Sequence, residues 1–141
     1  MKQLTIFFIA LMFFCVSAAS YGVEPDWTAY DKLLKQHVKP GKLEGIPLMR
    51  VDYIGIKNNV LYPEVLAQLK NYDTGKLQGK EEKLAFYINA YNILAIKMVL
   101  DHWPVKSIKD AGSLFSSVWN KDVGEINHKT VTLNEVENEI I

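Results

Sequence analysis

Apolar residues in the first half of the chain recur mostly three or four positions apart, the spacing of an α-helix. After Pro25-Asp26 this spacing predicts a helix from Trp27 to Val38, which Pro40-Gly41 ends. The β-branched and aromatic residues of Leu48–Ile56 favour a strand or an extended segment. A short helix with a buried stripe is then predicted at Val65, Leu66 and Leu69, followed by a polar loop at 71–79.

The segment from Glu81 to Asp101 has apolar residues on nearly every helical face, which predicts a buried central helix. A membrane span is the alternative, because the 17 residues of Leu84–Leu100 reach the lower length limit. Asn89, Asn92 and Lys97 would make a span costly, so a core helix is favoured. The two asparagines lie three apart and share a face. Their amides are interpreted either as ties to neighbouring loops or as groups that orient an active site.

The last forty residues show shorter signals. Trp103-Pro104 is predicted to stop the central helix, and Val105–Asp110 to form one helical turn. A packed loop is expected around Leu114, Phe115, Val118 and Trp119. Segments flanking Asn127-His128 predict a small β-hairpin.

The final predicted helix starts at a capping-box pattern, Thr132 with Glu135, and carries Leu133, Val136, Ile140 and Ile141. It shows no glycine, basic last turn or proline that would end it. This pattern favours a truncated chain, and a natural C-terminus is the alternative.

The first 18 residues have the pattern of a cleavable signal peptide. Lys2 precedes a 13-residue apolar run, Leu4–Val16, and small residues follow it. An uncut membrane anchor is the weaker alternative, because the run falls short of the roughly 20 residues that a span needs. We expect cleavage after Ala18 and a periplasmic or extracellular location.

Cleavage would change the chemistry that the chain can offer. Cys15, the only cysteine, would leave with the signal peptide, so no thiol chemistry and no cysteine metal ligand is expected in the mature chain. Without Lys2 the chain has 15 basic and 16 acidic residues, a balance that argues against a nucleic-acid partner. A membrane partner is expected only through the uncut signal peptide.

The familiar catalytic and cofactor motifs are absent from the sequence, and no cofactor is predicted. No phosphate-binding glycine loop and no Gly-x-Ser-x-Gly elbow occurs. His37, His102 and His128 are too far apart in sequence for the common zinc spacings, so no metal site is predicted. His37 is interpreted as a packed or capping residue, and His102 as a helix terminator.

The run from Ala85 to Asp110 closely resembles the signature of the family called domain of unknown function 547. Val51-Asp52-Tyr53, Val118-Trp119 and the segment from Thr132 to Ile141 support this resemblance. It extends from about Trp27 to the C-terminus. Residues 27–141 are therefore interpreted as an incomplete domain, the N-terminal portion of the family's full domain.

The resemblance implies an α+β domain related to papain-like or transglutaminase-like cysteine hydrolases, with a glutamate, a histidine and a cysteine as its site. Glu137 corresponds to the family's acidic residue and is expected to have an orienting role. The histidine and the cysteine have no counterpart here, so the chain is predicted to be inactive by itself. The substrate, a peptide or amide bond, is implied only as a class.

Two other functions remain open beside an exported hydrolase-like protein. One is a non-catalytic binding or scaffold domain of the cell envelope, with the same fold but no chemistry. The other is a small membrane-associated helical protein, which requires an uncut signal peptide or insertion of Leu84–Leu100.

Overall fold

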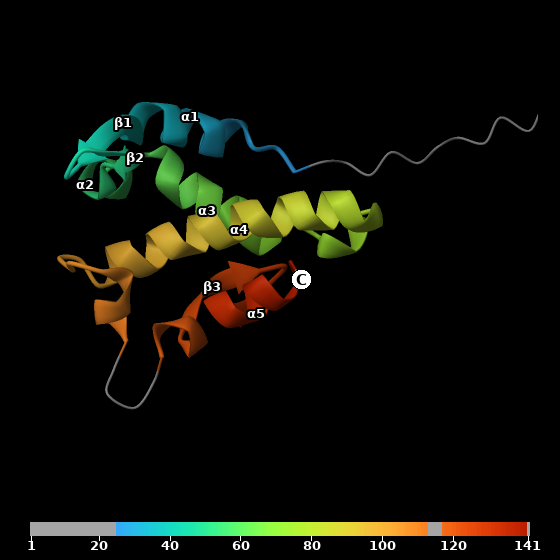
Figure 1. The fold of residues 1–141 in the computed structure, drawn as a ribbon. Coiled ribbons are helices and arrows are strands. Elements are labelled where there is room, and N and C mark those ends of the chain that lie inside the picture. The colour runs from blue at the N-terminus through green and yellow to red at the C-terminus, as the bar shows by residue number, and fades with distance from the viewer. Residues whose placement is uncertain (1–24, 113–116, 141) are drawn as a thin grey trace, which may run out of the picture.

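The fold is a mixed arrangement of helices and two small antiparallel hairpins around one long helix (Figure 1). The structure is a computed structural model that describes residues 25–112 and 117–140. The helices are α1 (Thr28–His37), α2 (Tyr53–Lys57), α3 (Leu61–Asn71), α4 (Gly79–Asp101) and α5 (Leu133–Asn138). The strands are β1 (Val38–Leu43), β2 (Ile46–Val51), β3 (Asp122–Ile126) and β4 (Lys129–Thr132), and the 3₁₀ turns are Thr74–Lys76, Ile108–Ala111 and Val118–Asn120. The predicted α+β class is confirmed.

Helix α4 separates two groups of elements. On one side lie α1, α2, α3 and the β1–β2 hairpin, and on the other lie the β3–β4 hairpin and α5 (Figure 1). Strand β3 contacts both α3 and α4, so the second hairpin links the two sides. The predicted hairpin around Asn127-His128 and the predicted stop of α4 before Trp103-Pro104 are both confirmed.

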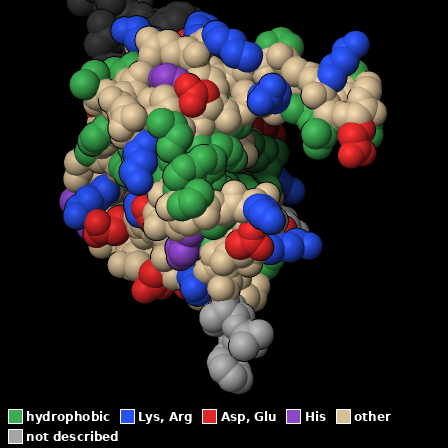
Figure 2. Space-filling view, turned by 90° about the vertical axis from the view of Figure 1, so that its left-hand side faces the viewer, with side chains coloured by type: hydrophobic (Ala, Val, Ile, Leu, Met, Phe, Trp, Pro, Cys, Tyr) green, Lys and Arg blue, Asp and Glu red, His purple; other side chains and the backbone are tan. Residues whose placement is uncertain are grey.

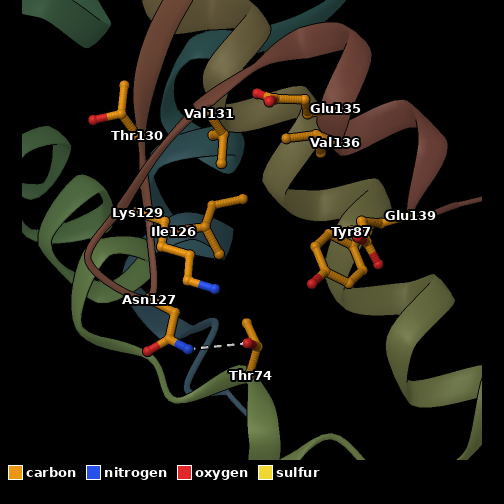
Figure 3. Close-up of a pocket in the computed structure, with 10 residues that line it drawn as sticks. All are labelled: Thr74, Tyr87, Ile126, Asn127, Lys129, Thr130, Val131, Glu135, Val136 and Glu139. Carbon is orange, nitrogen blue, oxygen red and sulfur yellow. Dashed lines mark hydrogen bonds between the residues drawn. The ribbon is translucent and has the colours of Figure 1, made fainter.

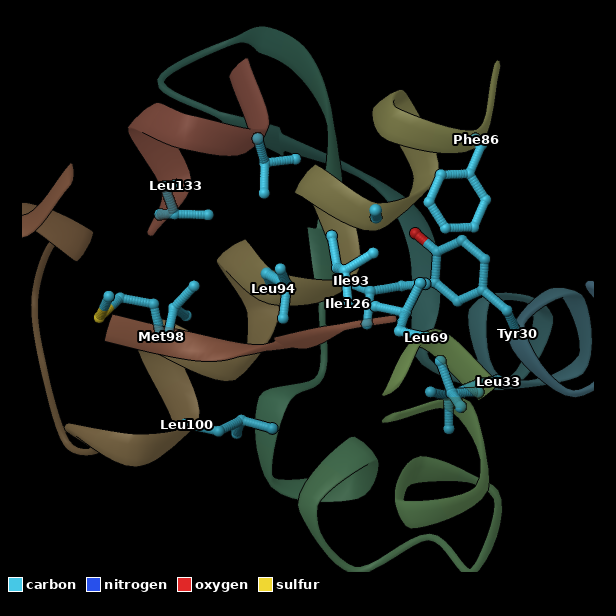
Figure 4. Packing of buried hydrophobic residues seen from close by; sticks show 14 of the residues in the cluster. Tyr30, Leu33, Leu69, Phe86, Ile93, Leu94, Met98, Leu100, Ile126 and Leu133 are labelled. Atoms are coloured by element: carbon cyan, nitrogen blue, oxygen red, sulfur yellow. The ribbon is translucent and has the colours of Figure 1, made fainter. Parts of the chain in front are cut away.

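The hydrophobic core is one cluster to which every helix contributes. Six buried residues of α4 form its centre, and Val65 and Leu69 of α3 pack against it, as the spacing in the sequence predicts. Leu133 and Val136 of α5 close the far side, with exposed fractions of 0% and 1%. Figure 4 shows Tyr30, Leu33, Leu69, Phe86, Ile93, Leu94, Met98, Leu100, Ile126 and Leu133 packed together.

Helix α4 is less buried than its composition suggests. Leu84 and Ile88 are 38% and 44% exposed, and Asn92 is exposed while Asn89 is half-buried. The described elements do not cover this stripe of the helix, because α1–α3 and α5 approach it from other directions. Asn92 is therefore exposed, although the apolar composition of the segment predicts a helix buried on nearly every face.

The first hairpin was not predicted. Helix α1 ends at His37, and Pro40-Gly41, interpreted as a helix stop, lies within β1. The extended segment predicted at Leu48–Ile56 is correct only through Val51. The Asp52 side chain accepts a hydrogen bond from the Gly55 N–H at 2.9 Å and starts α2.

The last helix is shorter than predicted. The last helix stops at Asn138 instead of running to Ile141, although its predicted capping box is present. The predicted signal peptide, residues 1–18, and the loop residues Leu114 and Phe115 lie outside the described residues. Within the described part of the chain, α4 alone is long and apolar enough to cross a membrane, a test that a buried core helix also passes.

Candidate functional site

A pocket of about 310 Å³ opens between α4, α5 and the turn of the β3–β4 hairpin. Both polar and apolar side chains face it, and Figure 3 shows them converging from these three elements and the 3₁₀ turn before α4. The lining residues are Thr74, Tyr87, Ile126, Asn127, Lys129, Thr130, Val131, Glu135, Val136 and Glu139.

The hairpin turn that forms one wall is held by backbone geometry. Asn127 and His128 have φ of 50° and 59°, which lets two residues connect strands with the right-handed twist. Their N–H groups donate to the carbonyls of Leu69 and Lys70 at 3.2 and 2.8 Å. The last carbonyls of α3 therefore have partners, and the turn is fixed at the pocket.

Side chains from distant parts of the sequence meet at the same wall. Asn127 Nδ2 donates to Thr74 Oγ1 at 3.1 Å, which ties the hairpin to the segment before α4 (Figure 3). Burial raises the pKa of Tyr87, the charge of Glu139 raises it further, and hydrogen bonding with Thr74 acts in the opposite direction. Tyr87 thus stays a neutral hydroxyl that can donate a hydrogen bond into the pocket.

Glu135 forms part of the opposite wall and is already used structurally. Its Oε2 accepts the Thr132 N–H at 2.7 Å, while its own N–H donates to Thr132 Oγ1 at 3.2 Å. These reciprocal bonds form the predicted capping box. The carboxylate of Glu135 is therefore fixed at the N-terminus of α5.

Glu137, the predicted site residue, lies just outside this pocket. It is exposed, and among the described residues no hydrogen bond or ion pair involves its carboxylate. It faces toward α4 closely enough for its charge to act on Tyr91: burial raises the pKa of that tyrosine, and Glu137 raises it further. The charges of Glu137 and Glu139 therefore act on Tyr91 and Tyr87 respectively, without a hydrogen bond between them.

None of the three histidines is paired with Glu137. His102 Nδ1 donates to the Met98 carbonyl at 2.9 Å, as expected of a helix terminator. Asp101 forms an ion pair with Lys97 instead of His102. His37 is bonded to Asp52 and Asn59 at the other end of the molecule, and His128 is exposed in the hairpin turn.

The pocket residues Thr74, Tyr87 and Asn127 were not predicted as site residues. Tyr87 lies in a nearly continuous apolar run, where its hydroxyl gives no separate signal, and Asn127 was interpreted only as a turn residue. The Asn127–Thr74 contact joins positions 53 residues apart, which no local pattern indicates.

The described residues can bind a polar ligand but lack the parts of a covalent catalyst. The pocket offers hydroxyl, amide, ammonium and carboxylate groups from Tyr87, Asn127, Lys129 and Glu139. In residues 25–112 and 117–140 no group of three or more potential metal ligands comes together. No serine, threonine or cysteine in the pocket wall has a histidine beside it.

The C-terminal half of the chain matches a known family. Residues 75–141 match the sequence model described as Protein of unknown function, DUF547. The DUF547 match begins just before α4 and includes the β3–β4 hairpin and α5, so it contains nearly all of the pocket wall and Glu137. Comparison with curated proteins and with solved structures gives no match.

Proposed function

We propose that this chain is part of an exported cysteine-hydrolase-like protein in which Glu137 orients a catalytic histidine. In this proposal the fold is a portion of a papain-like or transglutaminase-like domain. The histidine and the thiol nucleophile come from a segment other than residues 25–141. The bond attacked is of the amide or peptide class.

The observation that carries the proposal is the contrast between two neighbouring carboxylates. Glu135 is held by its capping box, whereas Glu137 has no hydrogen-bond or ion-pair partner among the described residues. A thiol nucleophile needs an imidazole to hold it as thiolate, and the imidazole needs an acceptor to orient it. Glu137 offers that acceptor within the matched family region.

The export part of the proposal comes from the sequence of residues 1–18. Their positive start, apolar run and small residues are typical of a cleaved signal peptide. Expression in a bacterial host with a C-terminal tag tests it by mass spectrometry. We expect the tagged protein in the periplasm to begin at Ala19. A full-length, membrane-retained protein would contradict export with cleavage.

The catalytic part is tested first by reading the coding sequence past codon 141. A frame that encodes a histidine and a cysteine supports the proposal, and an immediate stop codon contradicts it. The 141-residue chain itself is expected to show no hydrolysis of peptide or amide substrates.

In the longer product, Glu137→Gln is expected to lower kcat by about 10²- to 10⁴-fold, because the imidazole loses its orienting acceptor. Asn134→Ala is the control on the same helix, because Asn134 is exposed and lies outside the pocket lining, and it is expected to leave kcat within a few-fold. Equal losses in the two variants would show that Glu137 has no special role.

A specific observation also favours the non-catalytic alternative, an envelope binding or scaffold domain. The described pocket contains hydrogen-bonding groups from four segments but no nucleophile beside a base. An immediate stop codon together with a cooperatively folding chain would favour this binding role over the hydrolase.

A further inference from the structure

A second cavity, of about 390 Å³, lies at the base of the β1–β2 hairpin, away from Glu137. Its walls come from the end of α1, both strands, the start of α2 and the second residue after α4. Hydrophobic side chains bordered by charged ones gather on this face in Figure 2. It is lined by His37, Lys39, Pro40, Arg50, Val51, Asp52, Tyr53, Ile54 and Trp103.

Two cations face each other across the hairpin at this cavity. Lys39 and Arg50 are directly opposite in the β1–β2 register. Like charges at opposite positions of an antiparallel pair are destabilising unless an anion lies between them. Among the described residues neither side chain pairs with a carboxylate: Lys39 Nζ donates to the Lys35 carbonyl, and Arg50 has no polar partner.

The single carboxylate of the lining, Asp52, is already engaged. Asp52 Oδ1 accepts the Gly55 N–H at 2.9 Å, and Oδ2 lies 3.4 Å from His37 Nδ1. A Cβ on residue 55 would overlap both Asp52 Oδ2 and His37 Nδ1, so Gly55 lets them approach. His37 Nε2 in turn accepts the Asn59 amide at 2.9 Å. Both oxygens of Asp52 are therefore engaged, and Asp52 forms no ion pair with Lys39 or Arg50.

The remaining wall is aromatic and accessible. The rings of Tyr53 and Trp103 lie with centroids 5.6 Å apart and planes at 32°. Trp103 is 38% exposed and Ile54 is 45% exposed. An apolar or planar group could bury this surface while its charge reaches Lys39 and Arg50.

We propose that this cavity binds a small organic anion, a carboxylate or phosphate group attached to an apolar or aromatic body. Lys39 and Arg50 bind the anionic group, and the planar guanidinium of Arg50 matches two of its oxygens. The Tyr53–Trp103 surface packs against the body. The site does not depend on Glu137 or on the hydrolase proposal.

The test is a titration of the purified protein with phenylphosphonate and with benzoate, followed by amide NMR shifts. Shifts concentrated at residues 39, 50–54 and 103 are expected with at least one of the two probes, and the stronger probe identifies the preferred anionic group. Benzamide, which keeps the ring without the charge, is expected to bind at least tenfold more weakly. Inorganic phosphate, which has the charge without the ring, is also expected to bind at least tenfold more weakly.

Arg50→Gln is the deciding variant because it keeps Cβ, Cγ and Cδ, the stem that lies against Gly41, and removes the guanidinium. It is expected to weaken binding at least tenfold. Lys42→Gln is the matched control, since Lys42 is exposed on β1 and points to the opposite face of the same hairpin from Lys39 and Arg50.

Three results would overturn the proposal. They are the absence of local shifts with both probes, equal binding of benzamide, and equal weakening by Arg50→Gln and Lys42→Gln. The last would mean that only the general positive charge of the hairpin attracts the anion.

Discussion

The two hairpins of this chain share one local design and differ in what surrounds them. Each has two antiparallel strands joined by a two-residue turn with positive φ, Glu44-Gly45 in one and Asn127-His128 in the other. Each second strand leads directly to the N-cap of a helix, Asp52 or Thr132. Local geometry is therefore similar in both.

The two hairpins differ in how much of their side-chain surface is buried. The β3–β4 hairpin places Val123 and Ile126 in the core at 3% and 5% exposure. No residue of β1 or β2 is fully buried, and Leu43, Ile46 and Met49 are 60–67% exposed. The second turn also donates two hydrogen bonds to α3. An isolated two-stranded hairpin is at best marginally stable in water, so packing decides which hairpin contributes to global stability.

This contrast separates a structural role from a binding role. The β3–β4 hairpin builds the wall of the pocket near Glu137 and cannot move without opening the core. The β1–β2 hairpin contributes little to the core, and its unpaired cations and exposed apolar side chains remain available to a ligand.

The largest expected difference in stability is between two variants that shorten one isoleucine in each hairpin. Ile126→Ala is expected to lower the free energy of unfolding by about 2–5 kcal/mol, because it leaves a cavity beside Leu69 and Leu94. Ile46→Ala, at 67% exposure, is expected to change it by less than about 0.5 kcal/mol. Urea denaturation measures both, and similar losses would show that the first hairpin is also part of the core.

A smaller difference in the free energy of unfolding is expected when one methyl group is added to each hairpin. A Cβ on Gly124 would lie 2.6 Å from Leu94 Cδ2, a buried atom with little room to move. Gly124→Ala is therefore expected to cost about 1–3 kcal/mol.

The matched change in the other hairpin is Gly41→Ala, where the new Cβ would overlap the stem of Arg50. Arg50 is exposed and can swing into solvent, so a cost below about 0.5 kcal/mol is expected. Thermal denaturation compares the two variants, and a larger loss for Gly41→Ala would contradict the contrast.

The sequence predicted the elements whose signals are local. The apolar spacing of α3, the length of α4, the Asn127-His128 turn and the Thr132–Glu135 capping box are all confirmed. The β1–β2 hairpin was missed because Pro40-Gly41 normally ends a helix, and here that pair lies within an exposed strand. Because a hairpin that buries no full side chain lacks alternating hydrophobicity, its strands give little periodic signal.

The candidate sites were harder to predict for a different physical reason. Glu137 could be named only from the family resemblance, and the sequence does not show whether its carboxylate has a partner in the fold, as that of Glu135 has in the capping box. The contacts of Asn127 with Thr74, and of Tyr53 with Trp103, join residues about 50 positions apart. Helix α4 shows the same limit, because a helix apolar on every face does not reveal which face stays uncovered.

The smallest expected change in stability concerns Asp52 and Thr132, the N-cap residues of the helices that follow the two hairpins. The hydrogen bond from Gly55 and the one with His37 hold the pKa of Asp52 below its usual 3.8. A carboxyl whose pKa is lowered by folding stabilises the folded state above its unfolded pKa, and this contribution disappears as pH falls through the folded value. Asp52→Asn is therefore expected to be less stable than wild type near pH 7, with the difference shrinking below about pH 4.

Thr132→Ala serves as the comparison for the cap of the second hairpin. Its hydroxyl does not titrate in this range, so a loss of about 1 kcal/mol is expected to persist at acid pH. Urea denaturation between pH 7 and pH 3 measures both variants. A difference between Asp52→Asn and wild type that stays constant with pH would mean that the charge of Asp52 does not stabilise the base of the first hairpin. The two caps would then act by geometry alone.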